Sequence, residues 1–173
     1  NTRRLALADL NWTRLLPFRF AIAQCFDAPE CLPALGKIDS VRVAHNPASA
    51  STAGLLTCWM AVQLGWTPSN WSGNQICFHQ AGREIQAKFE PVATGSASGI
   101  AEIALSAQDL TISIKHSEGA NLLTAALRGK SFEREMSFSS APAQLVELLS
   151  CEMNPSARHK IYQRALALYQ AML

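Results

Sequence analysis

Thiols are the side chains of this sequence with the clearest capacity for chemistry, because they form disulfides and exchange them. The five cysteines are Cys25, Cys31, Cys58, Cys77 and Cys151. Cys58 falls in an apolar predicted helix and Cys77 in a predicted strand, so we expect both to be small core residues. Cys25 instead ends a predicted helix, and Cys31 lies in the proline-rich loop that follows. Cys25 and Cys31 are therefore the candidate redox pair.

Whether Cys25 and Cys31 can form a disulfide depends on where the preceding helix ends. Six helical residues at about 1.5 Å each would separate their Cα atoms by about 9 Å, whereas a disulfide needs about 7 Å or less. Pairing therefore requires the helix to stop near Phe26, which the prolines of the loop favour. So short a closed loop would stabilise the domain by only about 2 kcal/mol. That gain suits a reversible switch better than a structural crosslink, and two unlinked thiols remain the alternative.

No other pattern in the sequence is typical of a catalytic or metal site. The histidines are scattered without metal-ligand spacing, and we expect His45 and His116 to be partly buried structural residues. A phosphate-binding glycine loop and a Gly-x-Ser-x-Gly motif are both absent from the sequence. We also find no convincing acidic pair for general acid–base catalysis. We therefore expect no catalytic residue, no metal, no cofactor and no enzymatic activity.

Composition is compatible with a large core or with a surface that meets a partner. Charged residues make up 16% of the chain and hydrophobic residues 49%, whereas globular proteins average about 25% charged residues. Few charges imply a large buried fraction or a surface that meets a partner. The net charge of +2 is too small for a nucleic-acid-binding protein. No segment approaches the roughly 18 to 20 apolar residues of a membrane span.

The helical elements should lie near the two ends of the chain. Apolar residues recur at spacings of three and four up to Phe26, and Pro17 must fall in the first turn of that helix. Residues 52–64 are almost all apolar, which predicts a buried helix capped by Gly65. Two further helices are expected after Pro142 and Pro155.

The strands should lie between these helical regions. We expect one strand at 41–45, a loop from Trp66 to Asn74, and about six strands between Ile76 and Phe138, where the apolar period changes to two. Arg134 interrupts an apolar face and should occupy an edge position. The predicted fold is therefore α+β, an antiparallel β meander of about six strands packed with about four helices.

We expect a single domain spanning residues 1–173, with a basic arm and helix start at 1–16. The chain begins with Asn1 rather than Met, so we interpret it as a fragment of a longer protein. The helix start, Asp9-Leu-Asn-Trp-Thr-Arg-Leu-Leu-Pro-Phe-Arg19, is unusually rich in aromatic and charged residues. Tryptophan and arginine are frequent in protein interfaces. The partner-binding candidates are Trp12, Arg14, Phe18 and Arg19, with core packing and an Asp9–Arg14 ion pair as alternatives.

This segment, followed by Cys25-Phe-Asp27, resembles the signature of the OpcA family, the glucose-6-phosphate dehydrogenase assembly proteins of cyanobacteria and actinobacteria. The usual form is close to Asp-Leu-x-Trp-Thr-Arg-Leu-x-Pro-Trp-Arg, and Phe18 stands where tryptophan is common. Leu64-Gly65-Trp66 resembles a second landmark of the family. The similarity covers the C-terminal half of such a protein and is of the cyanobacterial type.

The resemblance implies a non-enzymatic, cytoplasmic allosteric activator that binds glucose-6-phosphate dehydrogenase in the oxidative pentose phosphate pathway. It also implies redox control, for which Cys25 and Cys31 are the candidates and a thioredoxin-type protein the reductant. One alternative is a sugar-phosphate-binding or -converting domain of the same pathway, with Arg14 and Arg19 holding the phosphate at a helix N-terminus. A purely structural domain, whose active surface lies outside this chain, is the third hypothesis.

Overall fold

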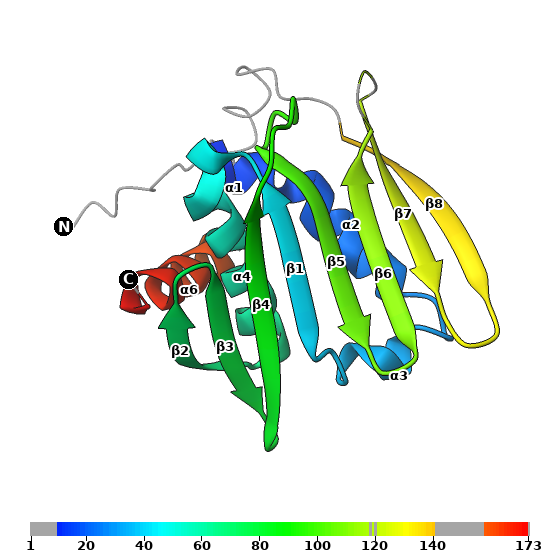
Figure 1. The fold of residues 1–173 in the computed structure, drawn as a ribbon, viewed down its shortest axis with the longest axis horizontal. Helices are drawn as coiled ribbons and strands as arrows, with labels where there is room; N and C mark the ends of the chain where they lie inside the picture. Colours follow the sequence, from blue (N-terminus) through cyan, green and yellow to red (C-terminus); the bar gives the residue numbers. More distant parts are fainter. Residues whose placement is uncertain (1–9, 118, 120, 141–157, 173) are drawn as a thin grey trace.

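The computed structural model describes residues 10–117, 119, 121–140 and 158–172, and eight strands form one sheet in this part of the chain. The sheet order is β2-β3-β4-β1-β5-β6-β7-β8 (Figure 1). The strands are β1 (Ser40–His45), β2 (Thr67–Ser72), β3 (Gln75–Gln80), β4 (Arg83–Pro91), β5 (Ile100–Ala107), β6 (Leu110–His116), β7 (Leu122–Arg128) and β8 (Glu133–Ser139).

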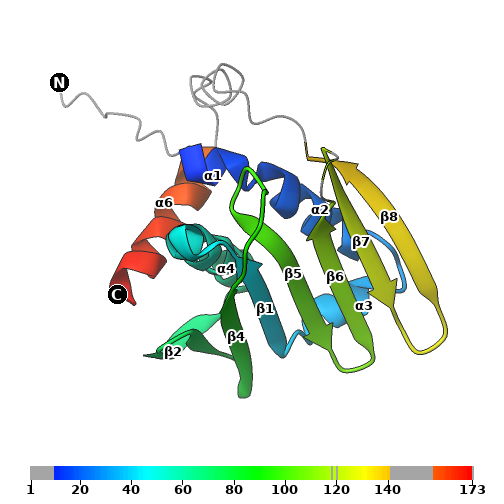
Figure 2. The same cartoon turned by 45° about the horizontal axis from the view of Figure 1, so that its top comes forward.

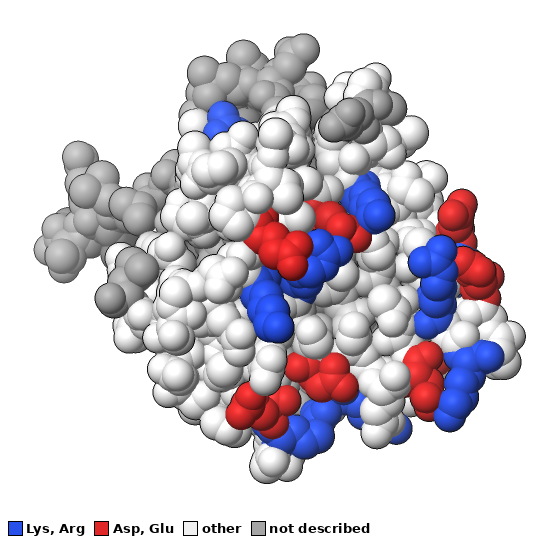
Figure 3. Space-filling view, in the orientation of Figure 1, with Lys and Arg blue, Asp and Glu red and all other residues white. Residues whose placement is uncertain are grey.

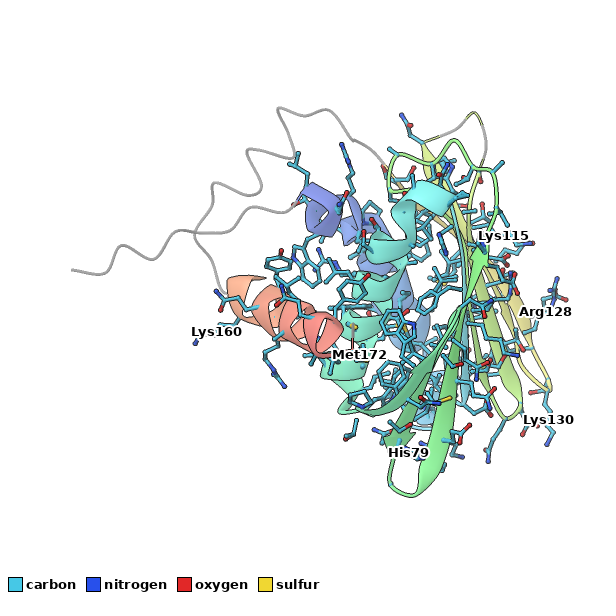
Figure 4. All side chains as sticks on the ribbon, turned by 60° about the vertical axis from the view of Figure 1, so that its left-hand side comes forward. His79, Lys115, Arg128, Lys130, Lys160 and Met172 are labelled. Atoms are coloured by element: carbon cyan, nitrogen blue, oxygen red, sulfur yellow. The ribbon has the colours of Figure 1, made fainter. Side chains whose placement is uncertain are left out.

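The described helices all lie on one face of this sheet (Figure 2). They are α1 (Leu10–Arg14), α2 (Leu16–Phe26), α3 (Leu32–Leu35), the 3₁₀ turn η1 (Pro47–Ser49), α4 (Ala50–Leu64) and α6 (Arg158–Ala171). Figure 4 shows the layers from the side, with Lys115 and Arg128 projecting away from the helices and Lys160 projecting from α6. The hydrophobic core therefore fills the space between one sheet face and the helices.

The α+β class is confirmed, but the sheet is larger and less regular than a six-stranded meander. β1 lies between β4 and β5 and runs parallel to β4, so the sheet is mixed. The described residues contain eight strands and five α-helices rather than about six and four. The predicted loop at 66–74 is wrong, because residues 67–72 form the edge strand β2. Most of β2 is solvent-exposed, so its sequence lacks the alternating apolar pattern of a strand that covers a core.

Several local predictions are confirmed. Pro17 lies in the first turn of α2, where its missing N–H costs nothing. Gly65 caps α4 with φ of 70°, a left-handed conformation that glycine adopts without strain. Arg134 lies on β8, at the edge of the sheet, with 47% of its side chain exposed. The predicted helix after Pro142 lies outside the described residues.

The sheet face that no described helix covers carries intermixed acidic and basic side chains (Figure 3). Arg42 contacts Glu90 at 3.0 Å and Glu102 at 2.6 Å. Ser113 also donates a hydrogen bond to Glu102, at 2.5 Å. Burial opposes ionisation of Glu102, but these hydrogen bonds and the Arg42 charge lower its pKa overall. Acidic and basic side chains on this face therefore pair with each other and do not form separate acidic or basic patches.

None of the helices in the described ranges has the length and apolar character needed to span a lipid bilayer.

Candidate functional site

The aromatic residues of the dense N-terminal motif are buried. Trp12 is 5% exposed and Phe18 is 2% exposed. The Trp12 ring packs 5.2 Å from the ring of Tyr162 on α6, which joins the two ends of the described chain. The structure therefore places Trp12 and Phe18 as anchors of the helix layer, and their contribution to partner binding stays a prediction.

The two arginines of the motif lie partly at the surface. The Arg19 guanidinium stacks 3.7 Å from the centre of the Trp12 ring and donates a hydrogen bond to the Trp12 carbonyl at 3.0 Å. A cation over an indole ring stabilises both groups by about 0.5–2 kcal/mol. Arg14 is half-buried at the end of α1. Its predicted partner, Asp9, lies outside the described residues.

The cysteine pair occupies the junction between α2 and α3. Helix α2 ends at Phe26, as a Cys25–Cys31 disulfide would require. The backbone then turns, because the amides of Cys31 and Leu32 both donate to the Ala28 carbonyl, at 2.9 and 3.0 Å. Cys25 and Cys31 are free thiols with no exposed surface. The predicted helix end is confirmed, and the disulfide itself stays a prediction.

Burial dominates the chemistry of both thiols. Desolvation, followed by the neighbouring Cys31 charge, raises the pKa of Cys25 from 9.0 to about 12. Burial and the Glu30 carboxylate raise the pKa of Cys31, while the Arg134 charge partly offsets this effect. Because the thiolate is the reactive form, both sulfur atoms are unreactive while this junction stays closed.

An ion pair connects the loop between the two cysteines to the edge strand β8. Arg134 on β8 donates a hydrogen bond to Glu30 at 2.9 Å. Both side chains are more than 40% exposed, so solvent screens the contact and it contributes at most about 1 kcal/mol. This link between residues 104 positions apart was not predicted from the sequence.

Next to the cysteine junction, an apolar groove opens between α2, α3 and α4. Its volume is about 290 Å³. Leu32, on its rim, is 57% exposed, although leucine usually lies inside proteins. Ten residues line the groove: Ile22, Ala23, Phe26, Asp27, Leu32, Leu35, Trp59, Met60, Gln63 and Leu64. Sequence analysis missed this groove, because its walls come from helices that are far apart in the chain.

Further apolar surface lies along the outer side of α2. Leu16 is 37% exposed and Phe20 is 55% exposed, and they lie four residues apart on one face of the helix. Ala23 continues this face and reaches the groove that it helps to line. The exposed apolar surface therefore runs from the start of α2 to Leu32.

The histidines in the described ranges do not assemble into a metal site. No group of three or more metal-ligating side chains occurs among those residues. His45 is 3% exposed, and its Nδ1 donates to the Asn46 carbonyl at 2.8 Å, so the predicted structural role is confirmed. His116 is half-buried at the end of β6, also as predicted.

Comparison with solved structures shows the fold. A mutant of the 3-ketoreductase KijD10 from Actinomadura kijaniata superimposes with a TM-score of 0.63 over 97% of this chain and 60% of that chain. The open conformation of KijD10 superimposes with the same TM-score over 94% of this chain and 59% of that chain. Sequence identity is 11% in both cases.

Comparison with sequences shows the family. A putative OxPP cycle protein OpcA from Synechocystis is 39% identical over 67 residues, which cover 39% of this chain and 14% of that protein. The corresponding protein of Nostoc punctiforme is 37% identical over 62 residues, which cover 36% of this chain and 13% of that protein. These alignments span only a small part of the relatives' length. The family model for the C-terminal domain of the glucose-6-phosphate dehydrogenase subunit OpcA matches residues 5–166. The chain therefore belongs to this family, which is the C-terminal part of OpcA proteins.

Proposed function

We propose that this protein binds glucose-6-phosphate dehydrogenase without being an enzyme itself, and promotes the active oligomeric form of that enzyme in the oxidative pentose phosphate pathway. The observation that carries this proposal is the family match over residues 5–166, because the family is described as a domain of a glucose-6-phosphate dehydrogenase subunit. The names of the OpcA relatives support the pathway. The mechanism is preferential binding to the active conformation, which raises its population. The site of action is the cytoplasm.

The groove beside Leu32 and the adjoining outer face of α2 are the contact surface in this proposal. An exposed leucine next to an apolar groove offers both a side chain to insert and a pocket to receive one. Trp12 and Phe18 act as anchors that position α2. Arg14 at the end of α1 and Arg19 near the start of α2 provide polar contacts at the rim of the interface.

The Cys25–Cys31 junction regulates this surface in our proposal, because the turn between the two thiols leads directly into α3 and Leu32. Oxidation joins the sulfur atoms and releases two protons and two electrons to an oxidising disulfide. A thioredoxin-type dithiol returns them and becomes a disulfide itself. Since both thiols are buried, the turn must open before either reaction. A disulfide would then hold α3 in a different position and alter the groove.

The proposal predicts that Leu32→Asp weakens binding to glucose-6-phosphate dehydrogenase. A buried charge at the centre of an apolar contact should lower affinity about tenfold or more, which corresponds to at least about 1.4 kcal/mol. Leu122→Asp is the matched control, because Leu122 is 42% exposed but lies on β7, away from the groove. The dehydrogenase is titrated with each variant, and its oligomeric state and substrate affinity are measured.

Equal behaviour of the Leu32 and Leu122 variants would contradict the groove as the contact surface. No effect of the unmodified protein on the dehydrogenase would contradict the proposed function altogether. The same titration with oxidised and reduced protein tests the switch. Redox dependence should disappear in Cys25→Ser and persist in Cys77→Ser, since Cys77 lies on β3.

A further inference from the structure

The two edges of the sheet are built differently. Edge β2 contains Pro68, and its pairing with β3 shifts register between Pro68 and Asn70. Proline and bulges are devices that prevent a further strand from pairing with an edge. Trp71 of the same strand also packs 5.9 Å from the Tyr169 ring on α6. Edge β8 has seven residues, neither proline nor glycine, and an unbroken register with β7.

The backbone groups of β8 that face outward are identified by its pairing with β7. Gly129 N donates to Phe132 O at 2.9 Å, and Ser140 N donates to Asn121 O at 2.8 Å. Because bonded residues alternate along an antiparallel pair, the even-numbered residues of β8 bond to β7. The N–H and C=O groups of Glu133, Glu135 and Ser137 therefore point away from the sheet. No strand of the described ranges lies beyond them (Figures 1 and 2).

We propose that β8 pairs with β8 of a second copy of this chain, antiparallel and centred on Met136, so that two sheets join edge to edge. Met136 is the midpoint of Glu133–Ser139, and this register therefore uses the whole strand. It brings the outward backbone groups of Glu135 opposite those of Ser137 in the other copy. In this register, residues whose N–H and C=O groups point outward lie opposite each other in the two copies, as hydrogen bonding between antiparallel strands requires.

The charges of β8 disfavour the registers centred nearer the start of the strand. Centring the pair on Glu135 would oppose two carboxylates, and centring it on Arg134 would oppose two guanidinium groups. Like charges directly opposite each other destabilise a strand pair. Centring on Met136 instead places Glu135 opposite Ser137 and Arg134 opposite Phe138. The acidic start of each strand thus lies opposite the uncharged end of the other strand. A second copy of this chain therefore provides a complementary edge.

Apolar side chains flank the edge on the helix side of the sheet. Met136 and Phe138 are half-buried, and Phe138 contacts Phe20 of α2 edge to face at 6.2 Å. Phe20 is 55% exposed. Two-fold pairing of β8 would bring these apolar groups of both copies close together, and it would remove part of the Phe20 surface from water.

The experiment is sedimentation velocity of the full chain over a concentration range from micromolar to millimolar. The expected result is a monomer–dimer equilibrium. Ser137→Glu places two carboxylate pairs opposite each other across the two-fold axis, so dimer affinity should fall about tenfold. Ser137→Ala should leave the affinity unchanged. Exchanging the two residues, as Glu135→Ser with Ser137→Glu, restores the Glu–Ser pairs and should restore the affinity.

Ser137→Pro is a second test, because it removes an outward N–H while leaving the bonds to β7 in place. It should abolish the dimer, with circular dichroism confirming that the variant folds. A monomer at every concentration would overturn the proposal and leave the edge to a strand of another protein. A dimer that tolerates both Ser137→Glu and Ser137→Pro would also overturn it.

Discussion

Burial controls the reactivity of the candidate redox pair. Cys25 and Cys31 are fully enclosed, and burial raises the pKa of Cys25 to about 12. Reactive cysteines normally have lowered pKa values and access to solvent. A switch at this site therefore depends on opening the turn that Glu30 and Arg134 fasten, so its speed would be set by that opening rather than by thiol ionisation alone.

The raised pKa of Cys25 predicts a loss of stability at alkaline pH. Its thiol holds its proton to about pH 12 in the folded state, against a reference pKa of 9.0. Between these values the unfolded chain binds fewer protons, so the free energy of unfolding falls as pH rises. The full contribution is present below pH 9 and is at most about 4 kcal/mol. Denaturant unfolding should show a shallower alkaline loss for Cys25→Ala. An identical pH slope would contradict the shift.

The packing of α4 against α6 depends on a glycine. A Cβ atom at Gly54 would clash with the ring of Tyr169, so the two helices approach each other over a position without a side chain. Such close contact explains how α6, from the end of the described chain, is held against the buried helix α4.

Gly54→Ala should therefore destabilise the fold. The added methyl group must displace Tyr169 or separate the helices, which costs about 1–3 kcal/mol in a packed core. Gly36→Ala is the matched control, because nothing lies within 4 Å of a Cβ atom there. Its φ of −76° also suits alanine, so its stability should stay equal or rise by up to about 1 kcal/mol. Thermal unfolding of both variants measures the difference, and equal losses would contradict the packing argument.

At the scale of the whole molecule, the two proposed interaction surfaces are centred on different elements and both include Phe20, which packs against Phe138 of β8. The groove lies between α2, α3 and α4, whereas the edge for self-association is β8. Glu30 and Arg134 connect them through one ion pair, which is too weak to couple the surfaces strongly.

Because Leu32 lies on α3 and Ser137 on β8, a variant at either position should leave the other surface intact. Leu32→Asp should weaken dehydrogenase binding without changing the monomer–dimer equilibrium. Ser137→Glu should weaken the dimer and leave dehydrogenase affinity within about twofold of the unmodified protein. Sedimentation velocity and a binding titration on both variants provide the four measurements. A loss of both activities in either variant would show that the surfaces are one.

Local sequence determined the elements whose boundaries depend on short-range sterics. Pro17 and Gly65 act on residues within a single helical turn, so the start of α2 and the end of α4 were predictable. The end of α2 at Phe26 was predictable for the same reason. The alternating face of β4 was predictable because successive side chains of a strand point to opposite faces of the sheet. The motif from Asp9 to Arg19 also identified the family, because it is contiguous.

Tertiary structure alone decided the features that join distant segments. The insertion of β1 between β4 and β5, the groove beside Leu32 and the Glu30–Arg134 contact leave no periodic signal in the sequence. Edge strand β2 was missed because its exposed residues have no apolar face to reveal it. A local pattern indicates which residues are buried. Only the folded chain shows which buried surfaces contact each other and which strand edges remain unpaired.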